Sequence, residues 1–423
     1  MISVIIPAFN VEAYIKDAIE SVQNQSHNEV EIIVVDDCST DRTSEIVNGL
    51  ARMYSNVIKC QTTGRLGPGG ARNLGIQHSS GEYLFFLDGD DVLPNDALYR
   101  LSSKQNETGA DIVIGNVIKY NEREEFDSNL HKKIKWDCTD GTTHISKRPD
   151  LFFDSTVTNK LYKKKFILDN ELSFPESISY EDIIYSLKAH VLAGEVALVD
   201  SVVYKWRNRD DAYNPSITQS RSGIENFTDR MQILNKCFEF LVERSDFESV
   251  QRYWHFKVLT VDFFLYLKEF KHLNSQYQDI LYDKIHSYLL RLPNKVLSRI
   301  PLKTRLLYQA ILADDREELK LLLELLWSRN QKVSTENVKT YDMVYNTSSD
   351  WNAKLAYPYN HVLWTQPYNS YGCEKVGKAS AYINASVNVK EEAATMHGSY
   401  CKIYKDDKEL GWVDARALEV KFN

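Results

Sequence analysis

Three aspartates stand close together in the stretch FFLDGDDVL, where an apolar run ends. Asp88, Asp90 and Asp91 surround Gly89, and carboxylates this close repel one another unless a positive group lies on them. Carboxylate oxygens are the ligands that Mg²⁺ and Mn²⁺ prefer, and such ions are usually held by one or two carboxylates together with substrate phosphates. The cluster therefore predicts a binding site for a divalent cation.

A second acidic pair, Asp36 and Asp37, follows the apolar run EIIVV. Ligands of open α/β sheets bind beyond the carboxyl ends of the strands. If the two apolar runs are neighbouring strands, a single crevice therefore holds all five carboxylates. The alternative is that aspartates cap turns and helices, which is preferred for Asp41 and Asp96.

The elements that position these residues alternate along the first 120 residues. Apolar runs typical of buried strands (SVIIPAF, EIIVVDD, NVIKC, EYLFFLD, ADIVIGNVIKY) alternate with amphipathic stretches such as VEAYIKDAIESVQNQ. This order predicts an α/β domain with a mostly parallel sheet and flanking helices.

A glycine-rich stretch, GPGGARNLGIQHS, lies between two of the predicted strands. It is expected to be a loop that runs into a helix carrying Arg72, whose guanidinium can reach an anion or a base edge. It is neither a P-loop nor a dinucleotide-binding fingerprint, because GxxxxGK[ST] is absent and no GxGxxG follows the first strand.

Later segments predict two further parts. Helical patterns fill the region around 224–330, which is expected to be an accessory bundle, and the polar stretch QKVSTENVKTY marks a linker. Short β-like runs with many turns then predict a small all-β module. The predicted domains are 1–222, 223–335 and 340–423.

Composition limits the class of protein. The chain has 423 residues, too many for one core, and its net charge of −8 argues against nonspecific binding to nucleic acid. No apolar run approaches the roughly 20 residues of a membrane span. The stretch MISVIIPAFN lacks a basic n-region and is expected to be a first strand rather than a signal peptide. The six cysteines form no CxxC pair, so reduced thiols are expected rather than zinc ligands.

Four motifs in order, VIIPAFNVEAYI, VVDDCSTDRT, GGARNLGI and FLDGDD, resemble the N-terminal half of the family-2 glycosyltransferases. The resemblance implies the GT-A fold and a nucleotide-sugar donor. It also implies that the donor is contacted by Pro7, Ala8, Asn10, Asp36, Asp37 and Arg72. Either of the two aspartates would contact the uracil, and the second is favoured.

The same resemblance assigns the aspartate cluster. Asp88 and Asp90 match the DxD motif of the family, with Asp90 as the main ligand of Mn²⁺ or Mg²⁺ and Asp88 nearer the ribose. Asp91 is expected to tune the site rather than bind the metal. The QxxRW motif of processive synthases is absent, so a non-processive enzyme is predicted.

The catalytic base is expected later in the chain. Glu181 and Asp182, in SISYEDIIYSL, look like the "ED" motif of the family at the start of a helix. Asp182 matches the base that takes the proton from the acceptor hydroxyl in an inverting displacement, and Glu181 is the rival. The non-catalytic alternative is a pair of carboxylates that the helix dipole favours.

The stretch KWRNRDDAYNPSITQS follows. Arg207 and Arg209 are candidates to contact the donor diphosphate or an anionic acceptor, and Ser216 and Thr218 are expected to shape a loop over the site. Family members that decorate wall teichoic acid carry a similar stretch of Arg, Asn and SIT, which favours that class of acceptor.

The C-terminal stretches WTQPY, YGCEKVG, GSYCKIY and GWVDARAL resemble the GW module, an SH3-like fold that holds Gram-positive surface proteins on teichoic-acid polymers. Residues 340–423 contain nine Lys and Arg but ten Asp and Glu, which argues against a strong electrostatic grip on a polyphosphate. Four aromatic residues are expected to form a sugar-stacking groove, or else the module's own core or a subunit contact: Trp351, Tyr357, Trp364 and Tyr368.

Together these features predict an inverting, metal-dependent UDP-sugar transferase that acts on wall teichoic acid, with UDP-GlcNAc as the first choice of donor and UDP-glucose or UDP-galactose next. The alternatives are the same chemistry on a capsular or exopolysaccharide intermediate and, thirdly, a non-catalytic polymer-binding protein. Expected partners are the UDP-sugar, an anionic cell-wall polymer and further copies of the chain bound through the C-terminal region, but no nucleic acid. The expected location is the cytoplasm, with at most peripheral association at the inner face of the membrane.

Overall fold

The computed structural model divides the chain into two compact units, Met1–Gln251 and Arg252–Asn423. The three-part division at 222 and 335 stays a prediction. The structure describes residues 1–420 without 129, 135, 137–140, 210–222, 245–247, 294–295, 328–344, 358–359, 369, 371–372 and 396.

Unit 1 contains an eight-stranded mixed sheet with the order β3-β2-β1-β4-β7-β5-β6, and β8 pairs with β5. Its strands are β1 (Ile2–Ala8), β2 (Val30–Asp36), β3 (Val57–Gln61), β4 (Tyr83–Phe86), β5 (Ile112–Tyr120), β6 (Glu125–Asp127), β7 (Lys160–Lys163) and β8 (Val196–Arg207). β3, β2, β1 and β4 are parallel, whereas β7 is antiparallel to both β4 and β5. The α/β class is confirmed, with an antiparallel strand inside the sheet that the apolar pattern did not reveal.

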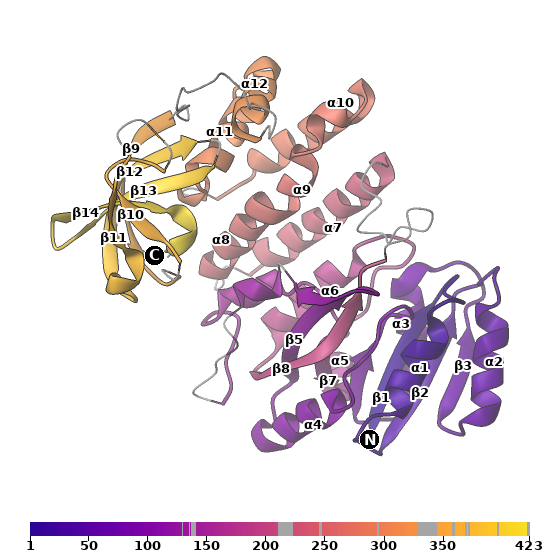
Figure 1. The fold of residues 1–423 in the computed structure, drawn as a ribbon. Coiled ribbons are helices and arrows are strands. Elements are labelled where there is room, and N and C mark those ends of the chain that lie inside the picture. The colour runs from indigo at the N-terminus through magenta and orange to yellow at the C-terminus, as the bar shows by residue number, and fades with distance from the viewer. Residues whose placement is uncertain are drawn as a thin grey trace. The chain divides into compact units, whose positions relative to one another are not determined.

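Helices cover both faces of this sheet (Figure 1). They are α1 (Ile15–Gln23), α2 (Thr43–Met53), α3 (Gly67–His78), α4 (Ala97–Thr108), α5 (Lys164–Asp169) and α6 (Glu181–Leu192), and α7 (Ile224–Val242) packs on α6. Alternate residues of β1 face opposite sides, as they must in a strand. Val4 and Ile6 share an apolar cluster with α1, α2 and α4, whereas Ile5 packs against Gly75 of α3.

The glycine-rich stretch forms the first turns of α3 and is not a loop, contrary to the expectation. Glycine is a weak helix former, so tertiary packing must explain it. A Cβ atom at Gly69 would lie 2.1 Å from the carbonyl oxygen of Pro175, and one at Gly75 would lie 2.3 Å from Cγ2 of Ile5. Only glycine lets α3 approach β1 and the segment before α6 this closely, which brings Arg72 between them.

Unit 2 combines helices with an all-β module. The helices are α8 (Glu248–Lys257), which begins before the unit boundary, α9 (Phe264–Leu267), α10 (Ser275–Leu289), α11 (Leu302–Leu312) and α12 (Arg316–Trp327). The seven-stranded sheet has the order β11-β10-β14-β13-β12-β9-β15. Its strands are β9 (Tyr345–Lys354), β10 (Val362–Trp364), β11 (Lys375–Lys378), β12 (Ser386–Thr395), β13 (Gly398–Lys405), β14 (Lys408–Asp414) and β15 (Glu419–Val420).

The Gly-Trp pair lies inside this module. Gly411 has φ +115°, and a Cβ there would lie 2.7 Å from the carbonyl oxygen of Trp364. Trp412 is buried in a cluster with Tyr400. A buried ion pair between Arg305 of α11 and Glu392 of β12, with Nη1 and Oε2 3.3 Å apart, joins the helices to the sheet within unit 2.

The four aromatics expected to form one groove are used in two ways. Trp351 donates from Nε1 to Glu392 at 3.1 Å and packs against the core of the module. Trp364 is partly buried, with its ring centroid 5.0 Å from that of Tyr368. Tyr357 and Tyr368 are exposed.

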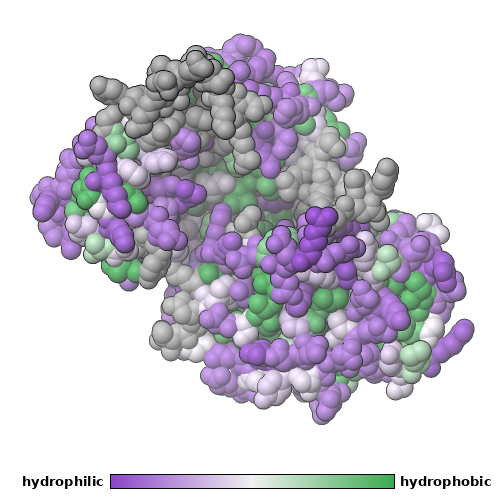
Figure 2. Space-filling view, viewed as in Figure 1, coloured by the Kyte–Doolittle hydropathy of each residue, from purple (hydrophilic) through white to green (hydrophobic). Residues whose placement is uncertain are grey.

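Hydrophilic side chains cover most of the surface in view, with smaller apolar groups between them (Figure 2). In the described part of the chain, no helix is both long and apolar enough to cross a membrane. The cysteines that the structure describes are free thiols, and Cys138 lies outside the described residues.

Candidate active site

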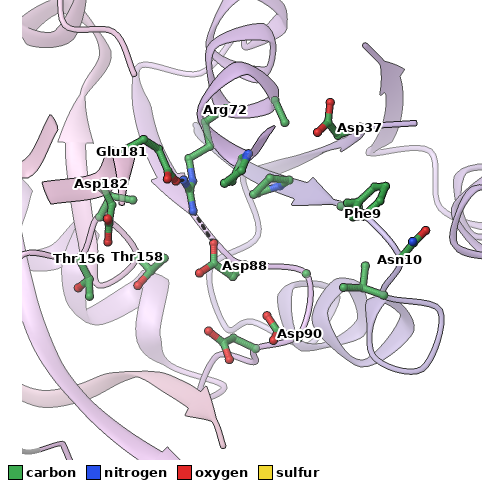
Figure 3. A pocket seen from close by; sticks show the side chains of 18 of the residues that line it. Phe9, Asn10, Asp37, Arg72, Asp88, Asp90, Thr156, Thr158, Glu181 and Asp182 are labelled. Carbon is green, nitrogen blue, oxygen red and sulfur yellow. Dashed lines mark hydrogen bonds and ion pairs between the residues drawn. The ribbon is translucent and has the colours of Figure 1, made fainter. Parts of the chain in front are cut away.

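A pocket of about 430 Å³ opens in unit 1 where β1, β2 and β4 end (Figure 3). A volume of this order is typical of small-molecule sites. Most of the site residues predicted from the sequence line it: Pro7, Ala8, Asn10, Asp37, Arg72, Asp88, Asp90, Asp91, Glu181, Asp182 and Arg209. Asp36 and Arg207 are not among the lining residues.

Arg72 links the two acidic motifs. Its Nη2 donates to Oδ1 of Asp88 at 2.7 Å, and its Nη1 donates to Oε1 of Glu181. Burial disfavours the charge of Arg72, but the carboxylates around it outweigh burial and raise its pKa. Burial also raises the pKa of Glu181 to about 7, against the opposing effect of Arg72. The guanidinium is therefore the positive partner of Asp88, and it connects the turn after β4 with the start of α6.

The other two aspartates are held from β8 and the residues after it. Nε and Nη2 of Arg209 both donate to Oδ2 of Asp90, at 2.9 and 2.6 Å. Arg207 donates from Nε to the carbonyl oxygen of Asp90 and from its backbone N–H to Oδ1 of Asp91, both at 2.7 Å. Tyr204 donates from Oη to Oδ2 of Asp91 at 2.6 Å. Both aspartates line the pocket, but Asp91 is a buried anchor for β8 whose pKa is raised by burial, whereas the side chain of Asp90 is 20% exposed.

Four of the five carboxylates line this one pocket, although β1 lies between β2 and β4, and Asp36 is the one that does not. Asp36 is completely buried. Asp37 accepts hydrogen bonds from the backbone N–H groups of Leu66 and Gly67, at 2.9 and 2.8 Å, and from Nη1 of Arg65 at 3.0 Å. It thereby fixes the start of α3, at the end of the pocket away from the aspartate cluster (Figure 3).

Phe9 and Arg65 also line this end of the pocket, and the sequence motifs did not predict them. Phe9 follows β1, and the guanidinium carbon of Arg65 lies 2.9 Å from the centroid of its ring. Asn10, with φ 51°, accepts a hydrogen bond from the backbone N–H of Thr40 at 2.8 Å and so holds the turn that presents Phe9. The position of Phe9 between the predicted residues Ala8 and Asn10 is the signal that could have found it.

Residues 156–158 form another side of the pocket that motif reading missed. In Figure 3, Thr156 and Thr158 lie on the same side as Asp182, opposite the end with Phe9. The surrounding stretch, FDSTVTNKLY, has no glycine-rich turn and no acidic pair. Its role therefore depends on contacts that only the fold creates.

Asp154 and Lys160 form an ion pair without contact with solvent, called the sealed pair, which holds residues 156–158 in place. Asp154 and Lys160 are both completely buried, with Oδ2 and Nζ 2.7 Å apart. Lys160 also donates to the carbonyl oxygen of Thr156 at 2.6 Å, and Ser186 of α6 donates to that of Asp154 at 3.2 Å. Burial would raise the pKa of Asp154, but the charges of Lys160 and His131 hold it well below its usual range.

Glu181 and Asp182 begin α6 but occupy different surroundings. Tyr180 precedes them with φ 68°, and its hydroxyl donates to Oδ1 of Asn226 in α7 at 2.8 Å. Glu181 is buried against Arg72, whereas Asp182 is only half-buried at the pocket wall. The two neighbouring carboxylates therefore have different access to a ligand.

Within the described ranges, no group of three or more His, Cys, Asp and Glu side chains is arranged to hold a metal. Asp88 and Asp90 supply two carboxylates on either side of Gly89, so further metal ligands would have to come from a bound molecule. Ser216 and Thr218 lie outside the described residues, and their expected role stays a prediction.

Comparison with known proteins identifies both ends of the chain. Residues 3–169 match the family described as Glycosyl transferase family 2. The N-terminal part of the chain is therefore similar to the family-2 glycosyltransferases over these residues. Residues 332–419 match the GW (Gly-Tryp) dipeptide domain. Both resemblances drawn from the motifs are therefore confirmed.

Curated relatives match about half of the chain. Glycosyltransferase GlyG of Streptococcus pneumoniae is 29% identical over 219 residues, which are 49% of this chain and 71% of that protein. The poly(ribitol-phosphate) beta-glucosyltransferase of Bacillus spizizenii is 28% identical over 59% of this chain and 38% of its own length. The poly(ribitol-phosphate) beta-N-acetylglucosaminyltransferase TarS of Staphylococcus aureus is 27% identical over 51% of this chain and 36% of its own length. The chain thus spans little more than a third of the two poly(ribitol-phosphate) enzymes.

Solved structures confirm the GT-A fold. Residues 1–349 of S. aureus TarS in complex with UDP-GlcNAc match with a TM-score of 0.63 and 21% identity, over 76% of this chain and 90% of that one. Another crystal structure of S. aureus TarS matches 97% of this chain and 76% of its own, with the same TM-score of 0.63 and 16% identity. Likeness at this identity shows the fold and leaves the chemistry to be argued from the site.

Proposed function

We propose that this protein transfers a sugar from a UDP-sugar to a hydroxyl group of a teichoic-acid-type polymer. The observation that carries the proposal is that one pocket holds the aspartates after β4 and the carboxylates at the start of α6, connected through Arg72. A single displacement from a nucleotide sugar needs both groups: oxygen ligands for a metal ion on the diphosphate and a base for the acceptor hydroxyl.

Asp88 and Asp90 fit the metal that the family implies. Both are carboxylates at the pocket, they flank a glycine, and both are neutralised in this structure by arginines, as a site built to hold positive charge would be. We propose Asp90 as the main ligand of Mn²⁺ or Mg²⁺ and Asp88 as the second. A divalent ion there would stabilise the negative charge of the leaving diphosphate. Once Asp90 is engaged, Arg209 becomes available to the diphosphate.

Asp182 is the proposed base. It takes the proton of the acceptor hydroxyl while the hydroxyl oxygen bonds to the anomeric carbon, and the bond from that carbon to UDP breaks with its electron pair on UDP. Attack opposite the leaving group inverts the anomeric configuration. Glu181 is 4% exposed and paired with Arg72, which supports Asp182 over its neighbour.

The nucleotide is placed at the end of the pocket with Pro7, Ala8, Phe9 and Asn10 in this proposal. The Phe9 ring offers a flat apolar face on which a base can stack. The carboxylate of Asp37 already accepts hydrogen bonds from two backbone N–H groups. If Asp37 contacts the uracil, it does so with a carboxylate that these bonds hold in place. UDP-GlcNAc stays the first choice of donor, with UDP-glucose and UDP-galactose next.

The acceptor class is supported by the names of two relatives, both poly(ribitol-phosphate) glycosyltransferases. A capsular or exopolysaccharide intermediate is the second candidate. A 33% identical relative, a GalNAc(5)-diNAcBac-PP-undecaprenol beta-1,3-glucosyltransferase of Campylobacter jejuni, supports the coarser class of a lipid-linked saccharide as acceptor. The GW domain would hold the polymer or a second copy of the chain. The proposed place of action is the cytoplasm, with at most peripheral association at the inner face of the membrane.

Product analysis with two carboxylate variants tests the proposal. Wild-type protein, Asp182→Asn and Glu181→Gln are incubated with Mn²⁺, each UDP-sugar, and either poly(ribitol phosphate) or an undecaprenol-linked saccharide, and NMR gives the configuration of the new bond. Loss of a general base is expected to lower kcat about 10²–10⁴-fold in Asp182→Asn, with UDP affinity retained. Full transfer by Asp182→Asn would place the base elsewhere, and transfer only to the lipid-linked saccharide would favour the second candidate.

A further inference from the structure

Thr158 is a polar side chain of the pocket whose hydroxyl has no hydrogen-bond partner among the described residues. The residue is 6% exposed, but its hydroxyl oxygen is not among the buried side-chain atoms that lack a partner, so it is accessible from the pocket. An accessible hydroxyl that finds no partner in its own protein bonds to water or to a ligand. Its neighbour Thr156 differs, because that hydroxyl is engaged by Oδ1 of Asp154 at 2.9 Å and by Oδ1 of Asn159 at 3.1 Å.

Thr158 is also held firmly in place. The adjacent Asn159 donates from Nδ2 to the carbonyl oxygen of Gly115 in β5 at 2.7 Å and to Oδ2 of Asp154 at 2.8 Å. Lys160 follows, in its sealed ion pair with Asp154. A β-branched side chain on a fixed backbone has few rotamers, so the hydroxyl of Thr158 points in a defined direction. The buried hydrogen bonds of Asn159 and the ion pair of Lys160 therefore fix the position of the unpartnered hydroxyl of Thr158.

Charge distinguishes this side of the pocket from the rest. The lining groups near β4 are aspartates and arginines, which suit a metal ion and a diphosphate. Residues 156–158 contribute two hydroxyls and a valine, which carry no charge. A neutral hydroxyl both donates and accepts a hydrogen bond, which is the pairing that a sugar or polyol hydroxyl offers.

We propose that Thr158 is a specificity-determining residue whose hydroxyl hydrogen-bonds a hydroxyl group of the reacting carbohydrate, on the side of the pocket with Asp182. This inference rests on the proposed glycosyl transfer and assigns the polar contact at its carbohydrate end. Two carbohydrates meet there: the sugar that is transferred and the polyol or sugar unit that accepts it. Both offer the same hydroxyl chemistry, and the experiment separates them.

The test compares Thr158→Val, which replaces the hydroxyl with a methyl group of similar size, with Thr158→Ser, which keeps the hydroxyl. Calorimetry in Mn²⁺ gives the affinity for UDP and for UDP-GlcNAc, UDP-glucose and UDP-galactose. Steady-state rates give kcat and KM for the donor that is turned over and for poly(ribitol phosphate). Loss of one hydrogen bond is expected to change the affected constant about 2- to 10-fold, with Thr158→Ser close to wild type.

The two sources give different results. If the transferred sugar is the partner, Thr158→Val weakens binding of the UDP-sugar and leaves that of UDP unchanged. If the acceptor is the partner, KM for poly(ribitol phosphate) rises and both nucleotide affinities stay as they are. Wild-type constants throughout in Thr158→Val would overturn the inference while the proposed function stands. Failure of the wild-type protein to bind UDP or any UDP-sugar would instead reject the proposed function and, with it, this inference.

Discussion

Two sides of the candidate active-site pocket neutralise a carboxylate in different ways. On the side of residues 156–158, Asp154 is paired with Lys160, and both side chains are 0% exposed. On the side of the aspartate cluster, Asp90 is paired with Arg209, and these side chains are 20% and 11% exposed. The first pair is shut off from solvent, whereas the second meets the pocket.

The difference indicates different tasks. A sealed pair cannot be replaced by a ligand, and removing one partner leaves an uncompensated buried charge, so it supports the fold of the segment that carries Thr158. A pair at the pocket can exchange its cation, so Arg209 can yield Asp90 to a metal ion. If substitutions in the two pairs change stability and activity alike, the two pairs do not have different tasks.

The largest expected effect is on stability, from Asp154→Asn. Breaking a buried ion pair costs about 3–5 kcal/mol, which corresponds to a fall in Tm of roughly 6–20 °C for a unit of this size. Calorimetry or circular dichroism gives the Tm. Asp169→Asn is the matched control, because Asp169 forms an exposed pair with Lys165 and is expected to contribute less than about 1 kcal/mol. Equal melting temperatures for the two variants would show that Asp154 and Lys160 do not support the fold.

Asp90→Asn is expected to act on the rate instead. Losing the proposed main metal ligand should lower kcat about 100- to 1000-fold, equivalent to about 2.7–4 kcal/mol of transition-state stabilisation, with little change in Tm. UDP release in Mn²⁺ is the measurement. Asp96→Asn, which removes an exposed partner of Arg100, should keep the wild-type rate. Metal-stimulated turnover by Asp90→Asn at the wild-type rate would contradict the assignment.

The sequence predicted one side of the pocket better than the other. Asp88, Asp90 and Asp182 could be located because they follow apolar runs or begin a helix within recognisable motifs. Asp154 and Lys160 could not, since their partners come from positions such as His131 and Ser186, which carry no local pattern. Contacts between residues far apart in the sequence decide burial, and burial decides what a charged residue does.

The sequence did not reveal the strand order or the start of α3, for related reasons. Apolar runs predict that strands exist but not which lie side by side. The position of β1 between β2 and β4, which places Asp37 and Asp88 at different parts of one pocket, was therefore hidden. The glycines of α3 argued locally for a loop, but close packing of Gly75 on Ile5 overrode their weak helix propensity.

Arg209→Gln tests whether Arg209 and a metal ion compete for Asp90. Mn²⁺ alone must displace Arg209 from Asp90, so removing the guanidinium should strengthen Mn²⁺ binding in the absence of nucleotide about tenfold, the worth of one charge-assisted hydrogen bond. Electron paramagnetic resonance of free Mn²⁺ gives the dissociation constant. Arg100→Gln, at an exposed pair, is the control. The same Mn²⁺ affinity in Arg209→Gln and wild type would mean that the two cations do not compete.

The smallest expected effect is on the pH dependence of stability, from a buried histidine near the sealed pair. His190 of α6 is buried, and its nitrogens have no hydrogen-bond partner among the described residues. Burial and the charge of Lys160 lower its pKa to about 3, from the usual 6.5 of a histidine. Between these two values the unfolded chain binds the proton and the folded one does not, so stability is lost as pH falls below about 6.5, by at most about 1.4 kcal/mol per pH unit.

His190→Leu should therefore flatten the fall of the free energy of unfolding between pH 6.5 and 4, and change it little at pH 7. Denaturant unfolding at several pH values measures this slope. His78→Leu, at an exposed position of α3, should keep the wild-type slope. An unchanged slope in His190→Leu would mean that water or a compensating charge reaches this side of the pocket, which would remove the distinction between the sealed pair and the open one.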